Sequence, residues 1–209
     1  MTQGGVGAPR RDYNPGETVL SPGLSTHLYR LESGLIRLHA IDTDEGKADA
    51  KSEAPRSLTL RYVKPGAYFG EEVLVSGERW YFADAVTRSS VSILDPADLD
   101  SDVRLALTDS LARSLDSVGR ALRRLARKPL RARVAAEVLE LADSDLATRG
   151  ADGATVVALT HDELAAAVGS VRETITKVVG DLVRLGAVRA GYGKLIVRDE
   201  RVLREVAGE

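Results

Sequence analysis

The sequence contains no cysteine, one methionine and three histidines among its 209 residues. The absence of cysteine excludes disulfides, thiolate zinc sites, iron–sulfur clusters and thiol nucleophiles, and it fits a reducing cytosolic compartment. No run approaches the roughly 20 apolar residues that a membrane span needs, and residues 1–15 lack the apolar core of a signal peptide. With 44% apolar and 29% charged residues, the chain is expected to be a globular cytoplasmic protein of one or two domains, two being favoured.

Motifs of the common catalytic and metal sites are also missing. The sequence has no Gly-x-x-x-x-Gly-Lys phosphate loop and no Gly-x-Ser-x-Gly elbow, and its histidines are scattered. We therefore expect neither an enzyme nor a metal site.

Charge is distributed unevenly along the chain. The formal net charge is −2, but residues 120–133 contain seven basic residues and no acidic one, and a local excess matters more for nucleic-acid binding than the sum. Two interpretations fit: these side chains contact DNA phosphates, or they solvate the outside of a helix. Solvation is favoured for Arg120, Arg123 and Arg124. The arginines left open are Arg131 and Arg133.

The N-terminal part is predicted to form short strands separated by glycine turns. Strands at this spacing, with no helical period between them, are typical of an antiparallel sandwich or roll. The expected strands are residues 18–20, 28–32, 35–41, 58–63 and 83–94. The polar, charged segment 42–55 predicts a long, mobile hairpin loop.

A helical period begins after Asp95 and carries a narrow apolar seam. Its members recur at intervals of four and three residues: Leu111, Leu115, Val118, Leu122 and Leu125. A narrow seam needs a partner helix, so residues 103–128 are predicted to pair with a second copy of the chain. The alternative is a helix packed along its own roll. Pro129 fits the first turn of a new helix, so the second domain is expected to start with a helix over residues 130–143.

Two helix start signals follow a few residues apart. Thr160–Glu163 has the Thr-x-x-Glu form of a capping box, Gly169 breaks the helix, and Ser170–Glu173 repeats the pattern as Ser-x-x-Glu. Two short helices joined through a glycine predict a helix-turn-helix. A hairpin over residues 188–197, after the second helix, extends the prediction to a winged helix.

The second helix, residues 171–185, is predicted to be two-sided. Its expected buried face consists of Val171, Ile175, Val178, Leu182 and Leu185. The opposite face carries Arg172, Glu173, Thr176, Lys177 and Arg184, with Gly180 between them. Such a face suits a major groove about 12 Å wide; the alternative is a solvated polar surface.

The order of roll, long helix and winged helix resembles the CRP/FNR family of bacterial transcription regulators over residues 13–197. The strongest similarity is the run Val168–Thr174, which is similar to the entry of that family's recognition helix. The run Gly66–Glu72 is similar to the glycine-rich turn and short helix that hold ribose and phosphate in cyclic-nucleotide members. The short helix resembles that of a stress-responsive, cysteine-free branch of the family.

The resemblance implies an α+β fold in three parts. These are an N-terminal antiparallel β-roll of the cyclic-nucleotide-binding type (residues 1–100), a dimerisation helix (101–128) and a C-terminal winged helix-turn-helix that binds DNA (129–209). It also implies a cytoplasmic homodimer that regulates transcription from palindromic sites, with RNA polymerase as a partner through residues 148–155. The half-sites are expected about 34 Å apart, one helical turn.

The resemblance carries DNA-reading roles onto named residues. Arg172, Glu173 and Lys177 are expected to read base edges, Arg172 at guanine and Glu173 at a cytosine amino group. Lys177 stands where the cyclic AMP receptor has arginine. For Glu173, capping its own helix is an equal alternative. The remaining DNA-binding candidates, at phosphates or thymine methyl groups, are Thr160, His161, Ser170, Thr174 and Thr176.

A cyclic AMP pocket is suggested as well, with departures from the family pattern. Its candidate residues are Gly70, Glu71, Glu72, Arg79, Trp80 and Val118. Arg79 matches the phosphate-binding arginine, but Trp80 replaces the serine after it and Val118 falls in the place of an adenine-contacting Thr-Ser pair. Alternatively, Glu71 caps the short helix and Arg79 pairs with Glu71 or Glu72. Three alternatives therefore remain for this chain. It is a transcription regulator modulated by cyclic AMP, a regulator controlled by its abundance without an effector, or a nucleotide-binding regulatory subunit that does not bind DNA.

Overall fold

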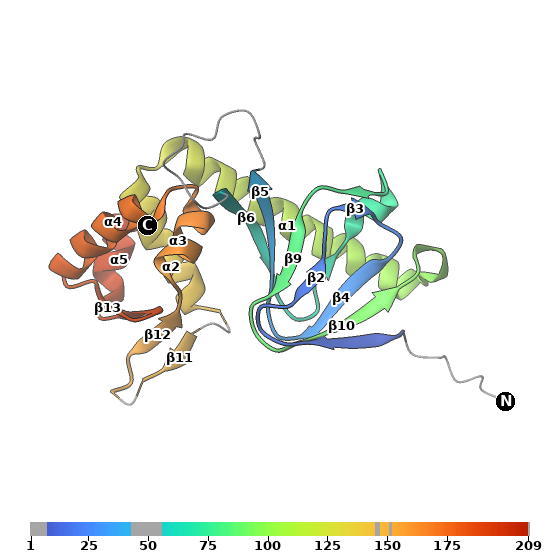
Figure 1. Cartoon of the computed structure of the whole chain (residues 1–209), viewed down its shortest axis with the longest axis horizontal. Helices are drawn as coiled ribbons and strands as arrows, with labels where there is room; N and C mark the ends of the chain where they lie inside the picture. The colour runs from blue at the N-terminus through green and yellow to red at the C-terminus, as the bar shows by residue number, and fades with distance from the viewer. Residues whose placement is uncertain (1–7, 43–55, 145–146, 151, 209) are drawn as a thin grey trace. The chain divides into compact units, whose positions relative to one another are not determined.

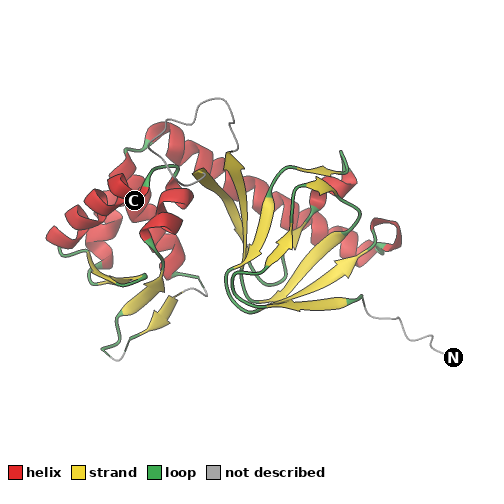
Figure 2. Cartoon of the chain, in the orientation of Figure 1, coloured by secondary structure: helices red, strands yellow, loops and turns green. Residues whose placement is uncertain are grey.

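The computed structural model describes residues 8–42, 56–144, 147–150 and 152–208. The chain divides into two compact units, one built from residues 1–41 and 60–118 and the other from 42–59 and 119–209. The hairpin loop expected over residues 42–55 lies outside the described residues, apart from Asp42. Figure 1 shows the order of the elements, and Figure 2 shows that strands dominate the first unit and helices the second.

The first unit is an antiparallel β-roll, as predicted. Its strands are β1 (Arg10–Tyr13), β2 (Thr18–Leu20), β3 (Gly23–Leu24), β4 (Leu28–Ser33), β5 (Ile36–Asp42), β6 (Arg56–Val63), β7 (Tyr68–Phe69), β8 (Glu78–Arg79), β9 (Phe82–Ala85) and β10 (Ser89–Leu94). They form two four-stranded sheets, in the orders β1-β10-β4-β7 and β2-β9-β5-β6, and a short β3-β8 pair. Two 3₁₀ turns complete the roll, η1 (Glu71–Leu74) and η2 (Pro96–Asp98).

The single strand expected over residues 83–94 is wrong. The chain leaves one sheet after β9 and enters the other at β10. At the crossing, the Ser89 hydroxyl donates to the Thr87 carbonyl at 2.9 Å and accepts from the Leu35 N–H at 3.2 Å. These bonds fix a turn that alternating apolar residues in the sequence do not reveal.

Apolar side chains from both sheets fill the core of the roll. Leu31, Ile36, Val63, Phe69 and Val91 are fully buried in one cluster. A second cluster joins the roll to the long helix α1 (Ser101–Arg127): Leu28, Tyr68, Leu99 and Leu107 are buried together, with Val103 and Leu111 packed against them. The first part of α1 therefore packs on its own roll.

The second unit is a winged helix-turn-helix. Its elements are α2 (Leu130–Ala142), β11 (Ala147–Arg149), β12 (Thr155–Ala158), α3 (His161–Val168), α4 (Arg172–Arg184), β13 (Val188–Gly191), β14 (Lys194–Val197) and α5 (Glu200–Ala207). The strands form one sheet in the order β11-β12-β14-β13. Pro129 is the N-cap of α2 rather than a residue of its first turn. The sequence did not predict β11 or α5, whose Leu203 is fully buried.

Neither a membrane-spanning helix nor a metal cluster is found in the described part of the chain. No helix there is long and apolar enough to cross a membrane. The same residues contain no group of three or more His, Asp or Glu side chains that could hold a metal ion.

Candidate nucleic-acid interface and effector region

The first helix of the helix-turn-helix begins at the predicted capping box. The Glu163 N–H donates to Thr160 Oγ1 at 3.2 Å, and the Thr160 N–H donates to Glu163 Oε2 at 2.7 Å. The helix ends at Gly169, which has a φ of 64° in the left-handed region that glycine adopts without strain. Both ends of α3 are thus fixed by local interactions in the sequence.

The second capping box does not form, so the expected start of α4 at Ser170 is wrong. The Ser170 N–H donates to the Ala165 carbonyl at 2.9 Å and therefore belongs to the C-terminal end of α3. The N-cap of α4 is Val171, and no side chain caps this helix. The capping alternative for Glu173 is wrong for the same reason, and its side chain is exposed.

The predicted two-sidedness of α4 is confirmed with corrections at both ends. Ile175, Val178 and Leu182 are buried. Val171 and Leu185, the two cap residues, are exposed, and Val179 is buried in addition. The exposed polar residues are Arg172, Glu173, Thr176, Lys177 and Arg184, while Thr174 and Gly180 are half-buried. The helix therefore offers solvent a hydrophilic face over its first turns, and Val183, which is 40% exposed, interrupts this face near its end.

Two polar contacts join the first turn of α3 to α4. His161 Nδ1 lies 2.9 Å from Thr176 Oγ1, and this hydroxyl donates to the Arg172 carbonyl at 2.9 Å. Since a hydroxyl has a single hydrogen, Thr176 is left to accept from the imidazole N–H. An ion pair joins Asp162 Oδ2 and Arg172 Nη1 at 3.3 Å. The side chains of His161, Thr176 and Arg172 thus lie together on one surface, and Asp162 is a member that sequence analysis missed.

The predicted hairpin after α4 is confirmed. β13 and β14 pair in antiparallel register with Gly191 opposite Lys194. Gly193 has a φ of +62°, and Tyr192 at the tip is fully exposed. Residues 148–155, expected as a loop that contacts RNA polymerase, include the end of β11 and the first residue of β12. Residue 151 lies outside the described residues.

The apolar seam of α1 is exposed over most of its length. The exposed fractions are 74% for Leu115, 45% for Val118, 65% for Leu122 and 43% for Leu125. Leu111, by contrast, packs against the roll. At this residue the alternative prediction, a helix packed along its own roll, is confirmed. Leu105, which the four-three spacing did not include, is 72% exposed. Large apolar side chains repeated along one helix in this way indicate an interaction surface.

The basic segment at the end of α1 is divided between internal contacts and solvent. Arg124 Nη2 lies 2.9 Å from Glu140 Oε2 on α2, and Lys128 donates to the Ala207 carbonyl at the end of α5. The side chains of Arg123 and Arg131 are exposed. The solvated interpretation therefore does not describe Arg124, whose side chain is only 22% exposed.

Glu137 lies close to this contact in α2. Burial, with a smaller contribution from the neighbouring Glu140 carboxylate, raises its pKa to about 7, and the charge of Arg124 opposes the rise. The pKa of a glutamate in the unfolded chain is near 4.5. Between pH 4.5 and pH 7 the folded protein therefore binds more protons than the unfolded chain does. Its stability therefore falls as the pH rises through that window.

We expect Glu137→Gln to remove this loss. At pH 8 the variant should exceed the wild type in free energy of unfolding by roughly 2 kcal/mol, a value reduced for partial solvent screening. Near pH 4.5 the difference should shrink to a few tenths of a kcal/mol, because both side chains are then neutral. Urea unfolding at the two pH values measures both differences. An equal difference at both would contradict the assigned pKa.

The expected effector region begins at Gly70. Its φ is 80°, and a Cβ atom there would lie 2.7 Å from the Tyr29 ring, so glycine is required. Gly70 precedes η1, which carries Glu71 and Glu72. No side chain caps η1, so the alternative role of Glu71 as its cap is wrong.

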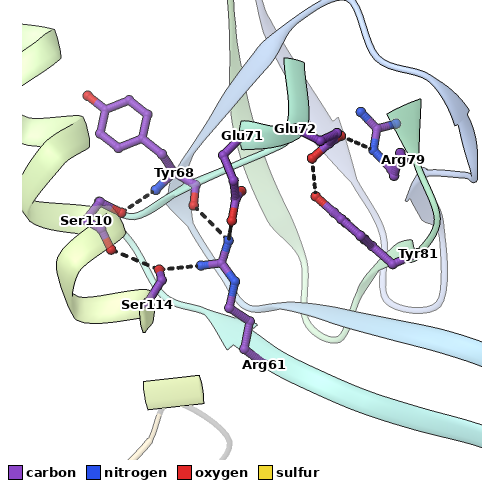
Figure 3. Close-up of polar contacts among 8 residues, drawn as sticks. All are labelled: Arg61, Tyr68, Glu71, Glu72, Arg79, Tyr81, Ser110 and Ser114. Atoms are coloured by element: carbon purple, nitrogen blue, oxygen red, sulfur yellow. Dashed lines mark hydrogen bonds and ion pairs between the residues drawn. The ribbon is translucent and has the colours of Figure 1, made fainter. Parts of the chain in front are cut away.

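Arg79 is paired inside the protein, as one alternative predicted. Its Nε lies 2.6 Å from Glu72 Oε1, and Nη2 donates to Ser25 Oγ at 2.7 Å. Nη1 donates to the Ser21 carbonyl at 3.3 Å. The Tyr81 hydroxyl donates to the other Glu72 oxygen at 2.7 Å (Figure 3). Each nitrogen of the guanidinium therefore has a partner within the protein, and the Arg79 side chain is only 5% exposed.

A second network connects η1 to α1 through Arg61, which sequence analysis missed. Arg61 Nη2 lies 2.6 Å from Glu71 Oε1, and Nη1 donates to Ser114 Oγ on α1 at 2.7 Å. On the same helix, Ser110 Oγ accepts from the Tyr68 N–H at 3.0 Å (Figure 3). An arginine at an ordinary strand position carries no sequence signal for this role.

These contacts decide how well a cyclic nucleotide fits. A phosphate needs guanidinium donors that are free and accessible, whereas three of the five N–H donors of Arg79 are bonded within the protein and its side chain is only 5% exposed. Glu71 Oε2 is buried without a hydrogen-bond partner, so it has capacity for a ribose hydroxyl. Val118 is 45% exposed and adds no polar group, and Trp80, which is 65% exposed, has only its indole N–H in place of a serine hydroxyl. The residues as arranged do not fit the phosphate of cyclic AMP.

Comparisons with known proteins agree with the two-part organisation. Residues 10–101 match the cyclic nucleotide-binding domain family, and residues 132–206 match the Crp-like helix-turn-helix domain family. The chain is 43% identical over 198 residues to the transcriptional regulator SdrP of Thermus thermophilus, across 93% of this chain and 92% of that protein. It is 32% identical over 206 residues to the cyclic AMP receptor protein of the same organism, across 95% and 88%.

Solved structures give the same result. The crystal structure of a CRP/FNR-family transcriptional regulator from Thermus thermophilus matches with a TM-score of 0.86 at 41% identity, covering 96% of this chain and 99% of that chain. These similarities indicate a transcription regulator rather than an enzyme. The chain belongs to the CRP/FNR family of transcription regulators and carries the family's helix-turn-helix DNA-binding domain.

Proposed function

We propose that this regulator binds palindromic promoter DNA as a homodimer and that α4 enters the major groove. The observation that carries the proposal is the exposed hydrophilic face of α4 above a buried apolar face. A major groove about 12 Å wide admits one helix with its side chains. No side chain caps the start of α4, so the first turn of this face is open to a ligand.

Three side chains on that face read bases in this proposal. Arg172 donates to O6 and N7 of guanine, and Glu173 accepts from a cytosine amino group. Lys177 adds a point charge with less geometric selectivity than an arginine fork. With its hydroxyl engaged by the protein, Thr176 offers its methyl group to thymine. The phosphate contacts come from His161, Ser170 and Thr174. Thr160 does not contribute one, because both its N–H and its hydroxyl donate to Glu163 Oε2.

Dimerisation follows from the exposed apolar seam of α1. Leu115, Val118, Leu122 and Leu125 supply the contacts with the same helix of a second copy, as in other paired helices with a seam of this period. Leu111 contributes at the edge, since it also packs on the roll. Two-fold symmetry then places the two recognition helices about 34 Å apart on DNA.

Insertion of a half turn of DNA between half-sites tests this geometry. An operator selected from random duplexes is expected to be palindromic, and about five extra base pairs at its centre should weaken binding at least tenfold, roughly 1.4 kcal/mol or more. About ten extra base pairs serve as the control, because they restore the rotational phase at a larger spacing. Equal affinity for all spacings would contradict a symmetric dimer on one face of the duplex.

The internal pairing of Arg79 favours regulation without a small-molecule effector over modulation by cyclic AMP. Glu72 takes the place of a phosphate beside the guanidinium, and Arg61 links η1 to α1 without a ligand. Activity would then follow the abundance of the protein. Residues 148–155 are proposed to contact RNA polymerase in the cytoplasm, in keeping with the role of a transcription regulator.

A further inference from the structure

Asp162 is the acidic neighbour of the proposed base-reading arginine. It lies in the first turn of α3, beyond the Thr160 cap, and its Oδ2 is 3.3 Å from Arg172 Nη1 on α4. The side chains of Asp162 and Arg172 are 64% and 65% exposed. An ion pair this exposed contributes between about 0 and 1 kcal/mol to folding. Its charge suits the first turn of α3, but that role does not require the contact with Arg172.

The carboxylate has two consequences for a guanidinium that approaches DNA. Arginine has five N–H donors in a planar fork, and Asp162 engages Nη1, which leaves the Nε and Nη2 edge for the two acceptors of guanine. The negative charge also repels phosphates, so it lowers affinity for duplexes of any sequence. The first effect improves recognition of the correct base, whereas the second weakens every complex.

The second contact between α3 and α4 also involves Arg172. His161 precedes Asp162 in the chain and contacts Thr176, whose hydroxyl is bonded to the Arg172 carbonyl. The backbone and the side-chain end of Arg172 are thus both connected to the first turn of α3. Such an arrangement reduces the conformational freedom that Arg172 would otherwise lose on binding a base.

We propose that Asp162 is a positioning residue that sets the DNA specificity of this regulator. It holds the Arg172 guanidinium for guanine and disfavours phosphate contacts on non-operator DNA. The proposal rests on the proposed function, because it requires Arg172 to read a base. It assigns discrimination between sequences to a residue outside the recognition helix.

Full-length Asp162→Asn and Asp162→Glu variants test this role. Dissociation constants are measured for a selected operator, for that operator with the Arg172-contacted base pair replaced, and for an unrelated duplex, at several salt concentrations. We expect Asp162→Asn to bind the unrelated duplex more tightly and to lose roughly fivefold to tenfold in discrimination against the replaced base pair. Asp162→Glu, which keeps the charge, should restore most of the discrimination.

Asp181→Asn is the matched control, since Asp181 is an acidic residue of α4 paired with Arg184. It should tighten binding to all duplexes alike and leave discrimination unchanged. If Asp162→Asn behaves like this control, Asp162 acts only through its charge and the inference is overturned. Thermal unfolding confirms that the variants fold, and Asp162 is not a member of the Thr160–Glu163 capping box.

Arg172→Ala separates this inference from the proposed function. In that background, Asp162→Asn should change discrimination no further, because the group it positions is gone. If Arg172→Ala itself leaves discrimination unchanged, the base-reading role fails and Asp162 has no reading group to position. If Arg172→Ala abolishes discrimination and Asp162→Asn does not reduce it, only the positioning role is rejected.

Discussion

Replacement of Arg79 by alanine is expected to lower the free energy of unfolding by about 3–5 kcal/mol. The substitution removes the partner of Glu72, whose side chain is 11% exposed, and leaves a buried carboxylate without its cation. Ser25 Oγ also loses its donor. Burial, the Glu71 charge and the Glu72 contacts raise the pKa of Tyr81, so its hydroxyl stays a neutral donor to Glu72 and does not replace the lost positive charge. Urea unfolding measures the loss of free energy of unfolding, provided that the m-value is the same in the variant and the wild type.

Arg198→Ala is the control for that variant, because Arg198 pairs with Asp152 in a contact where both side chains are about half exposed. It should change stability by less than about 0.5 kcal/mol. Calorimetric titration of cyclic AMP into the wild type should give no binding heat if Arg79 is structural. A small loss of stability, together with a binding heat that disappears in Arg79→Ala, would contradict the structural role and support the cyclic AMP alternative.

The double variant Leu115→Asp/Leu122→Asp is expected to be monomeric. Both leucines are largely exposed on α1, and burying each against a partner is worth about 1.5–3 kcal/mol. Aspartates on facing helices add repulsion and desolvation. We therefore expect the dimer dissociation constant to rise at least about a hundredfold, which corresponds to roughly 2.7 kcal/mol. Analytical ultracentrifugation measures it.

Loss of the dimer should carry over to DNA. Each monomer then binds one half-site, so affinity for the palindrome should fall to that for a single half-site. Ala112→Asp, an exposed position of α1 outside the seam, is the control and should remain dimeric. A dimer that persists in the double variant would place the interface elsewhere on the molecule.

The parts of the structure that sequence analysis predicted are those set by local interactions. The Thr160–Glu163 box, the glycine that ends α3 and the hairpin over residues 188–197 each involve residues a few positions apart. The period of α4 likewise follows from spacing alone. Residue types at fixed intervals are therefore sufficient to locate the helix-turn-helix and its wing.

Features that depend on distant residues were missed or mistaken. Arg61 reaches Ser114, far along the chain, and only the packing of α1 on the roll brings them together. Ser170 has the sequence of an N-cap but its N–H is used to end α3. The role of Asp162 was missed as well, because its contact with Arg172 forms only when α3 and α4 pack together. Competition between local signals is decided by tertiary structure, which a single sequence does not display.

Binding of Arg172→Ala to a selected operator tests the central claim most directly. Dissociation constants for the operator and for each single base-pair replacement compare the variant with the wild type at one salt concentration. We expect the variant to lose about 1–3 kcal/mol on the operator and to become indifferent to the base pair at one position of each half-site. If its affinity and its preference at every position equal those of the wild type, α4 does not read DNA through Arg172.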